Sequence, residues 1–175
     1  KNFKIKKVNI KNQKIEIFPN DFRNYLKYFQ KNNVNNLIVK NCKLFFSDAQ
    51  GNNISIKSFD LKNTFDDQKE KILIKGVFAE NKFKINFLNK KNDEKYLNFS
   101  TPNLGTKMKI IFDKDSNLEE TSGKLNLKKL NNIFLINFDG GNTYKISESF
   151  FRNKFLNSKL DGSINLKKDF YFDLN

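Results

Sequence analysis

The sequence has no histidine and only one cysteine, and these absences remove the commonest routes to catalysis. Without histidine there is no imidazole general base, no His-assisted Ser or Cys nucleophile and no usual zinc site. The single Cys42 allows no disulfide within the chain, and we expect it to be a structural thiol in a strand rather than a nucleophile. Enzyme activity is therefore the least supported class of function, and no cofactor is expected.

Apolar residues are also scarce, and they form no long run. They make up 38% of the 175 residues, with no tryptophan, whereas about 45–50%, glycine included, is typical of globular domains. The longest apolar run covers residues 133–136, and a membrane-spanning helix needs about 20 apolar residues. No Pro/Gly/Ser-rich linker divides the chain, so we expect one segment over 1–175. Its first residue, Lys1, predicts that an anchor, a signal or further domains have been removed upstream.

Charge of one sign dominates, with a formal net charge of +14. Only two of the 33 basic residues are Arg, the better residue for bidentate phosphate and base contacts. The lysines are scattered rather than clustered, and Lys, Asn, Phe and Ile are inflated together, which is typical of an A/T-rich coding sequence. We therefore expect that the residues at solvent-facing positions have drifted to Lys and Asn. We expect no nucleic-acid partner. A second interpretation places the basic face near an anionic membrane surface.

What the chain does have is alternation of apolar and polar residues. A period of two places all the apolar side chains of an extended strand on one face. The clearest examples are Ile54/Ile56, Phe83/Ile85/Phe87, Met108/Ile110/Phe112, Leu125/Leu127 and Phe170/Phe172/Leu174. The pattern predicts a mainly β fold with a long, curved antiparallel sheet that is apolar on one face and wet on the other.

The pattern also predicts how the chain is organised. Leading strands occupy 1–18, a region at 19–33 contains a short helix over about 21–31 that starts at Pro19-Asn20-Asp21, and repeating antiparallel strands fill 34–175. A hairpin covers 37–61, and a parity slip near Asn41 predicts a β-bulge. A second short helix or irregular crossover is expected over 147–157. Further strands are expected at 71–79, 82–88, 95–100, 106–113, 122–128, 133–138, 159–167 and 169–174.

One short segment occurs twice. Gly-Lys-Leu-Asn-Leu-Lys-Lys over 123–129 resembles Gly-Ser-Ile-Asn-Leu-Lys-Lys over 162–168. Repeats of this kind predict a sheet that is extended by adding strands rather than a closed globule. Chance similarity in a Lys/Asn-rich chain is the alternative.

The remaining polar motifs do not form sites. Asp66-Asp67 and Glu119-Glu120 lie in polar loops, where solvated charges are expected. The stretch 113–117 lacks the Gly and the closing Glu of a calcium loop. The Gly pair in 139–142 is not followed by a helix that would hold a phosphate. The sequence therefore predicts no metal site.

The first long hairpin resembles a known family. Leu37-x-Val39-x-Asn41-x-x-Leu44-x-Phe46-x-Asp48, a turn, and Ile54-x-Ile56-x-x-Phe59-x-Leu61 are similar to the hallmark hairpin of the AsmA-like proteins. The lead-in helix over 21–31, the Gly76-Val77-Phe78 strand and the Leu160-Asp161-Gly162-Ser163-Ile164 strand also resemble segments of that family. The family pattern usually has Gly where this chain has Cys42.

The resemblance implies a fold and a function. AsmA-like proteins are anchored in the bacterial inner membrane and project into the periplasm. Their repeating strands curl into an open groove akin to that of bridge-like lipid transfer proteins, and they are thought to pass phospholipids toward the outer membrane. They are not enzymes and need no cofactor. Partner proteins of the envelope are not indicated.

We therefore expect the apolar face to hold phospholipid acyl chains, which need continuous apolar contact and no hydrogen bonds. The alternative is a structural or adhesive β-domain with a closed core, such as a surface lipoprotein module, whose sheet buries its apolar face against itself. The residues predicted to contact acyl chains are Leu44, Phe46, Ile54, Ile56, Ile72, Ile74, Phe83, Ile85, Phe87, Ile110, Phe112, Leu125, Leu127, Ile164 and Leu166.

Overall fold

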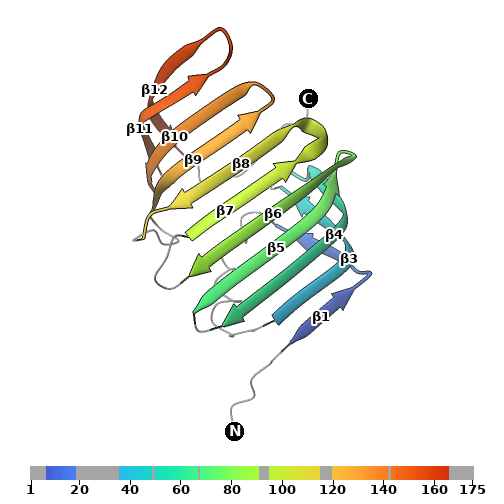
Figure 1. Ribbon diagram of the computed structural model, residues 1–175. Helices are drawn as coiled ribbons and strands as arrows, with labels where there is room; N and C mark the ends of the chain where they lie inside the picture. The colour runs from blue at the N-terminus through green and yellow to red at the C-terminus, as the bar shows by residue number, and fades with distance from the viewer. Residues whose placement is uncertain are drawn as a thin grey trace.

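The protein is one open, curved β-sheet of twelve strands, which forms a groove rather than a closed barrel (Figure 1). The computed structural model describes residues 7–18, 36–48, 50–66, 68–90, 95–114, 120–141 and 143–165. From β3 to β12 each strand pairs antiparallel with the next in the chain. The prediction of a mainly β fold with a long antiparallel sheet is confirmed.

The elements follow the chain in simple order. They are β1 (Val8–Lys11), β2 (Lys14–Ile17), β3 (Asn36–Ser47), β4 (Asn53–Asp66), β5 (Lys69–Phe78), β6 (Asn81–Lys90), β7 (Lys95–Thr101), the 3-10 turn η2 (Pro102–Leu104), β8 (Thr106–Phe112), β9 (Thr121–Lys129), β10 (Asn132–Gly140), β11 (Thr143–Arg152) and β12 (Asn157–Asn165). Within the described ranges, no helix is long and apolar enough to cross a membrane.

The first two strands depart from the antiparallel pattern. β1 and β2 both pair with β3 in parallel, one along each half of that long strand. Alternation predicts that a strand exists, but it does not say which neighbour the strand takes or in which direction it runs. The expected helix over 21–31 and the expected strand over 169–174 lie outside the described residues.

The buried core lies at this end of the sheet. It consists of Leu37, Val39, Cys42, Leu44 and Phe59 of β3 and β4, with partly buried residues of β1 and β2 packed against them. Here β3 and β4 bend. Ile56, beyond the bend, covers Gly76 of β5 so closely that a Cβ at Gly76 would lie 2.7 Å from Ile56 Cγ2. Gly76 therefore leaves room for the Ile56 side chain on the apolar side of the sheet.

A kink of the same construction occurs near each end of the sheet. In β3 it falls at Asn41, with φ 50°, whose backbone N–H donates to Asp60 Oδ1 of β4 over 2.8 Å. In β11 it falls at Glu148, with φ 46°, whose backbone N–H donates to Asp161 Oδ1 of β12 over 3.1 Å. Both sites carry a register shift typical of a β-bulge. The bulge predicted near Asn41 is confirmed.

The residue after each kink is the most buried in the described chain. Cys42 is 0% exposed and Ser149 is 1% exposed. Each side chain accepts a hydrogen bond from a backbone N–H. Gln13, between β1 and β2, donates to Cys42 Sγ over 3.4 Å, and Asn137 of β10 donates to Ser149 Oγ over 2.8 Å. A small polar atom thus satisfies a backbone donor that the bulge leaves without its ladder partner. The structural role expected for Cys42 agrees with its burial.

The second kink explains a wrong prediction. Residues 147–157 form no helix; they are the end of β11, a short connection and the start of β12. The bulge at Glu148 shifts the side-chain alternation by one, and the spacing of Phe151 and Phe155 after Ser147 then imitates a helix. The same kind of parity slip correctly predicted the bulge at Asn41.

The repeated segment also has an unexpected arrangement. Gly123 begins the copy in β9 and Gly162 begins the copy whose described part is in β12. Because β9, β10, β11 and β12 alternate in direction, the two copies run in opposite directions. They are therefore not related by translation along the sheet, although the sheet is extended strand by strand as the repeat predicted.

Candidate lipid-binding face

The register aligns apolar side chains into rows that cross the strands. One row takes one apolar residue from each of nine neighbouring strands, β3 to β11. Its members are Val39, Leu61, Ile74, Ile85, Phe99, Met108, Leu127, Phe134 and Phe151. We call the side of the sheet that carries this row the apolar face.

A second row runs beside the first, from β5 to β10. Its members are Ile72, Phe87, Leu97, Ile110, Leu125 and Ile136. Paired residues in adjacent strands lie on the same face, and the two rows are two residues apart along every strand they share. The two rows therefore form a continuous apolar strip across the middle of the sheet.

The structure brings the predicted contact residues together on this face. By the same register, fourteen of the fifteen lie on it, and Leu166 lies outside the described residues. Ile164, in β12, is the most exposed of them at 55%. Leu97, Phe99 and Phe134 also belong to the rows, although they are not among the predicted contact residues; their alternation with polar residues is visible in the sequence.

No second layer covers the strip in the part of the chain that the structure describes. The strands contact one another as neighbours within the single sheet, and the extra element η2 contacts only β6 and β8 closely. Apart from the β1–β4 core, the rows are half-buried rather than buried. A sheet that buried this face against a partner layer would exclude solvent from it as completely as it does from Leu44.

Polar groups interrupt the apolar face at one margin. Glu70 lies two residues before Ile72, near the start of β5, and is paired with Asn89 of β6. Lys95 is the first residue of β7. Burial raises the pKa of the Glu70 carboxyl above its ordinary value, against the opposing effects of a hydrogen bond from Asn89 and the charge of Lys95. The cluster places a half-buried carboxyl beside the strip.

Glycine shapes the face next to this margin. Gly123 pairs with Phe112 on one side and Phe138 on the other. The two rings meet edge to face with centroids 6.5 Å apart. A Cβ at Gly123 would lie 2.2 Å from the Ile111 carbonyl oxygen, in a backbone conformation with φ 156°. The absence of a side chain therefore lets the strands approach and the aromatic pair form.

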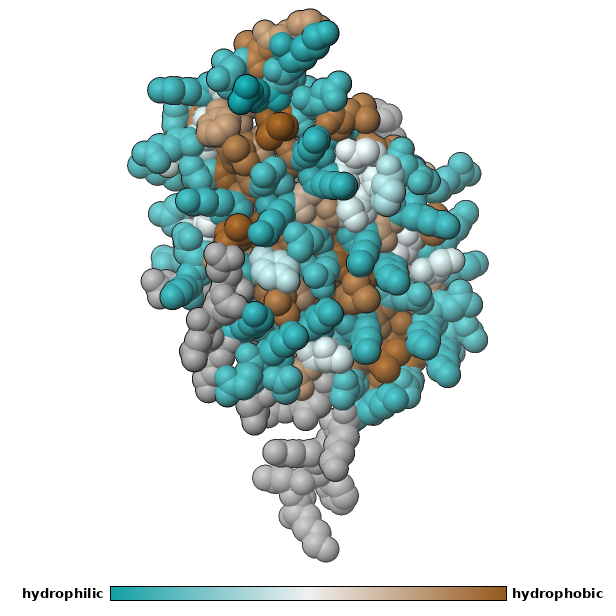
Figure 2. Space-filling view, viewed as in Figure 1, coloured by the Kyte–Doolittle hydropathy of each residue, from teal (hydrophilic) through white to brown (hydrophobic). Residues whose placement is uncertain are grey.

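The opposite side of the sheet is basic, and we call it the lysine face. In each strand its residues alternate with those of the apolar face, and many of them are exposed lysines. Figure 2 shows a face on which hydrophilic side chains predominate and hydrophobic ones lie between them.

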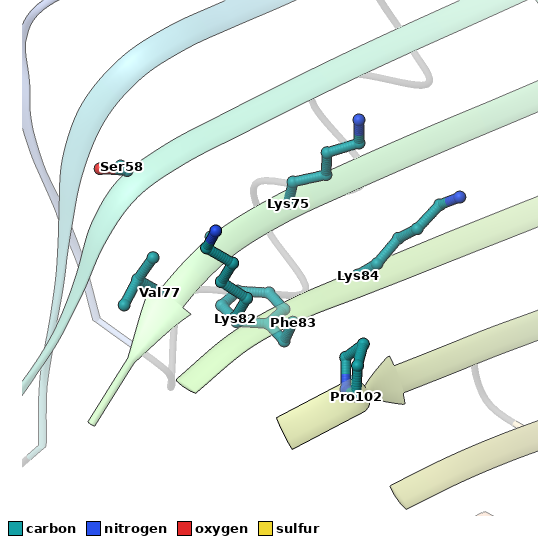
Figure 3. Close-up of a pocket in the computed structure, with 8 residues that line it drawn as sticks. Ser58, Lys75, Val77, Lys82, Phe83, Lys84 and Pro102 are labelled. Atoms are coloured by element: carbon teal, nitrogen blue, oxygen red, sulfur yellow. The ribbon is translucent and has the colours of Figure 1, made fainter. Parts of the chain in front are cut away.

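An open pocket of about 250 Å³ lies at the register shift between β4 and β5. Its lining includes Ser58, at the bulge in β4, and Lys75, Lys82 and Lys84 of β5 and β6. Figure 3 shows the three lysines projecting to the same side of these strands. The remaining lining residues are Gly76, Val77, Phe83 and Pro102.

These arrangements permit apolar binding on one face and anion binding on the other. Among the described residues, no group of three or more His, Cys, Asp or Glu side chains is placed to hold a metal ion. Comparisons with protein-family models, with curated proteins and with solved structures found no match for the chain.

Proposed function

We propose that the chain is a segment of a lipid-conducting groove in the bacterial cell envelope. The apolar face holds phospholipid acyl chains as they pass through the periplasm between the inner and outer membranes. An inner-membrane anchor outside this chain would hold the segment in place. The resemblance of the 37–61 hairpin to AsmA-like proteins supports this proposal, as does the open sheet.

The observation that carries the proposal is the unbroken apolar row across nine strands. Neighbouring strands are about 4.8 Å apart, so the row extends for about 38 Å. One leaflet of a bilayer core is about 15 Å thick, half of the about 30 Å core. The row is thus longer than one extended acyl chain. Each methylene removed from water there contributes about 0.8 kcal/mol.

A closed-core structural domain is the competing function. It requires a second layer over the rows, and the buried members of the core cluster all lie in β3 and β4. Half-burial of the rows from β5 to β11 favours an exchangeable occupant over a permanent one.

The absence of tryptophan makes a direct binding test available. Ile110→Trp and Lys109→Trp each introduce a single tryptophan at neighbouring positions of β8, on opposite faces. Phosphatidylcholine brominated on its acyl chains, which has no net charge to attract the lysine face, should quench the fluorescence of Trp at 110 and leave Trp at 109 bright. Equal quenching at the two positions, or none at either, contradicts the proposal.

A transfer assay tests function with a matched pair in β9. Leu125→Asp and Asn126→Asp each add one negative charge, on opposite faces of the same strand. An Asp amid hydrocarbon costs about 2.5–3.5 kcal/mol. Leu125→Asp should therefore slow transfer of fluorescent phospholipid between vesicles at least about tenfold, and Asn126→Asp should not. Circular dichroism checks folding, and Leu125→Asn provides a milder variant. Transfer that is unaffected in a folded Leu125 variant refutes the proposal.

A further inference from the structure

The lysine face carries a row of cations parallel to the apolar row. Following the register from β5 to β11, its seven positions are Lys75, Lys84, Ser100, Lys107, Lys128, Ile133 and Arg152. All five basic side chains in the row are exposed. Positive charge is therefore concentrated in space, although the lysines are scattered in the sequence.

This row is unfavourable for the isolated protein. Lys75 is directly opposite Lys84, and Lys107 is directly opposite Lys128. Like charges at such cross-strand positions destabilise a sheet. The carboxylate at the β4 end of the row, Asp60, accepts the Asn41 backbone N–H of the kink. An anionic partner that lies along the row would relieve the repulsion.

The pocket lies at the β5 end of the row. Lys75 and Lys84 belong to both, and Lys82 adds a third ammonium group at the rim. Val77 and the aliphatic parts of the lysines give the pocket apolar walls. A cavity with cationic rim and apolar walls suits a phosphate group that is attached to an apolar body.

A membrane surface fits this face better than a nucleic acid does. Apolar residues such as Leu73, Ile111 and Leu135 alternate with the lysines on the lysine face. Lysines can extend their charges from such a surface to lipid phosphates while their stems cover apolar area. Four of the five cations in the row are lysines, which act as point charges, whereas base and bidentate phosphate contacts favour arginine.

We propose that the lysine face docks on a bilayer that contains anionic phospholipid, with the row of cations along the headgroups and one headgroup phosphate in the pocket beside Ser58. The docked sheet presents its apolar face away from the headgroups. This orientation separates attachment to the membrane from the acyl-chain contacts of the proposed function.

The test compares two triple variants with the same change of charge. The row variant carries Lys75→Gln, Lys84→Gln and Lys107→Gln. The control carries Lys114→Gln, Lys129→Gln and Lys154→Gln, which are also exposed but lie in loops or on the other face. Binding is measured by flotation with vesicles of phosphatidylcholine alone or with about one-third phosphatidylglycerol. A juxtamembrane lysine contributes about fivefold in partitioning, so the row variant should lose about a hundredfold and the control far less.

Specific results would overturn the proposal. These are equal losses in the two variants, equal binding to both kinds of vesicle, or tighter binding to duplex DNA or RNA than to the anionic vesicles. Binding to anionic vesicles should also weaken as salt is raised. Thermal unfolding of the row variant should occur no lower than that of the wild type, because the changes remove like-charge pairs. Fluorescence quenching of Trp at 110 reports the apolar face independently, so failure of docking and failure of acyl-chain binding are distinguishable.

Discussion

The hydroxyl of Ser149 offers a sharp test of how the sheet bends. Ser149 is 1% exposed, and its Oγ accepts the Asn137 N–H over 2.8 Å and donates to the Ser147 carbonyl over 2.9 Å. Ser149→Ala leaves a backbone donor in the bulge without a partner, which costs about 1–3 kcal/mol. For a chain of this size, about 2 kcal/mol lowers Tm by roughly 4–8 °C.

Two other variants make the comparison specific. Ser147→Ala removes an exposed hydroxyl two residues away and should change stability by no more than about 0.5 kcal/mol. Ser149→Cys should recover part of the loss, because Cys42 accepts a backbone N–H at the corresponding position of the other kink. Thermal denaturation followed by circular dichroism measures Tm, and hydrogen exchange reports the Asn137 amide. If Ser149→Ala is as stable as Ser147→Ala, the hydroxyl does not support the bend and our reasoning is wrong.

Three further predictions concern single residues. Gly123→Ala places a Cβ against the Ile111 carbonyl oxygen; it should cost about 2–4 kcal/mol in urea unfolding, and a cost below about 1 kcal/mol would show that the strands can separate there. Because burial raises the pKa of Glu70, its contribution to stability is present below the unfolded pKa and is lost as pH rises through the folded pKa. Glu70→Gln should therefore raise Tm at about pH 8 and have little effect at about pH 3.5, and the opposite pH dependence would refute the assignment. Cys42, which is 0% exposed, should react with a thiol reagent only in urea; rapid labelling in buffer would contradict its burial.

Alternation predicted most of the sheet because each strand has one apolar and one polar face. The hairpin of β5 and β6 falls within two residues of its expected bounds at each end. The side on which Leu125 or Phe87 lies follows from parity alone once the strands pair in sequence order. Parity in the sequence was therefore enough to choose fourteen contact residues that the structure places on one face.

What the sequence did not predict depends on partners in space. The parallel pairing of β1 and β2 with β3 is a choice of neighbour, which local pattern does not encode. The kink at Glu148 depends on Asp161, thirteen residues away. The row of cations was hidden for the same reason, since lysines that are far apart in the chain become neighbours only through the register. Pairing between distant segments therefore concentrates positive charge that is evenly spread along the sequence.

The row architecture has a consequence for how such a chain can change over evolutionary time. Every strand from β3 to β11 supplies one residue to the long apolar row and bonds only to the strands beside it. Duplication or loss of a two-strand unit therefore alters the span by about 10 Å and leaves the parity of every other strand intact. A sheet of this kind can therefore be lengthened or shortened by whole hairpins, and the side chains of the remaining strands need no change.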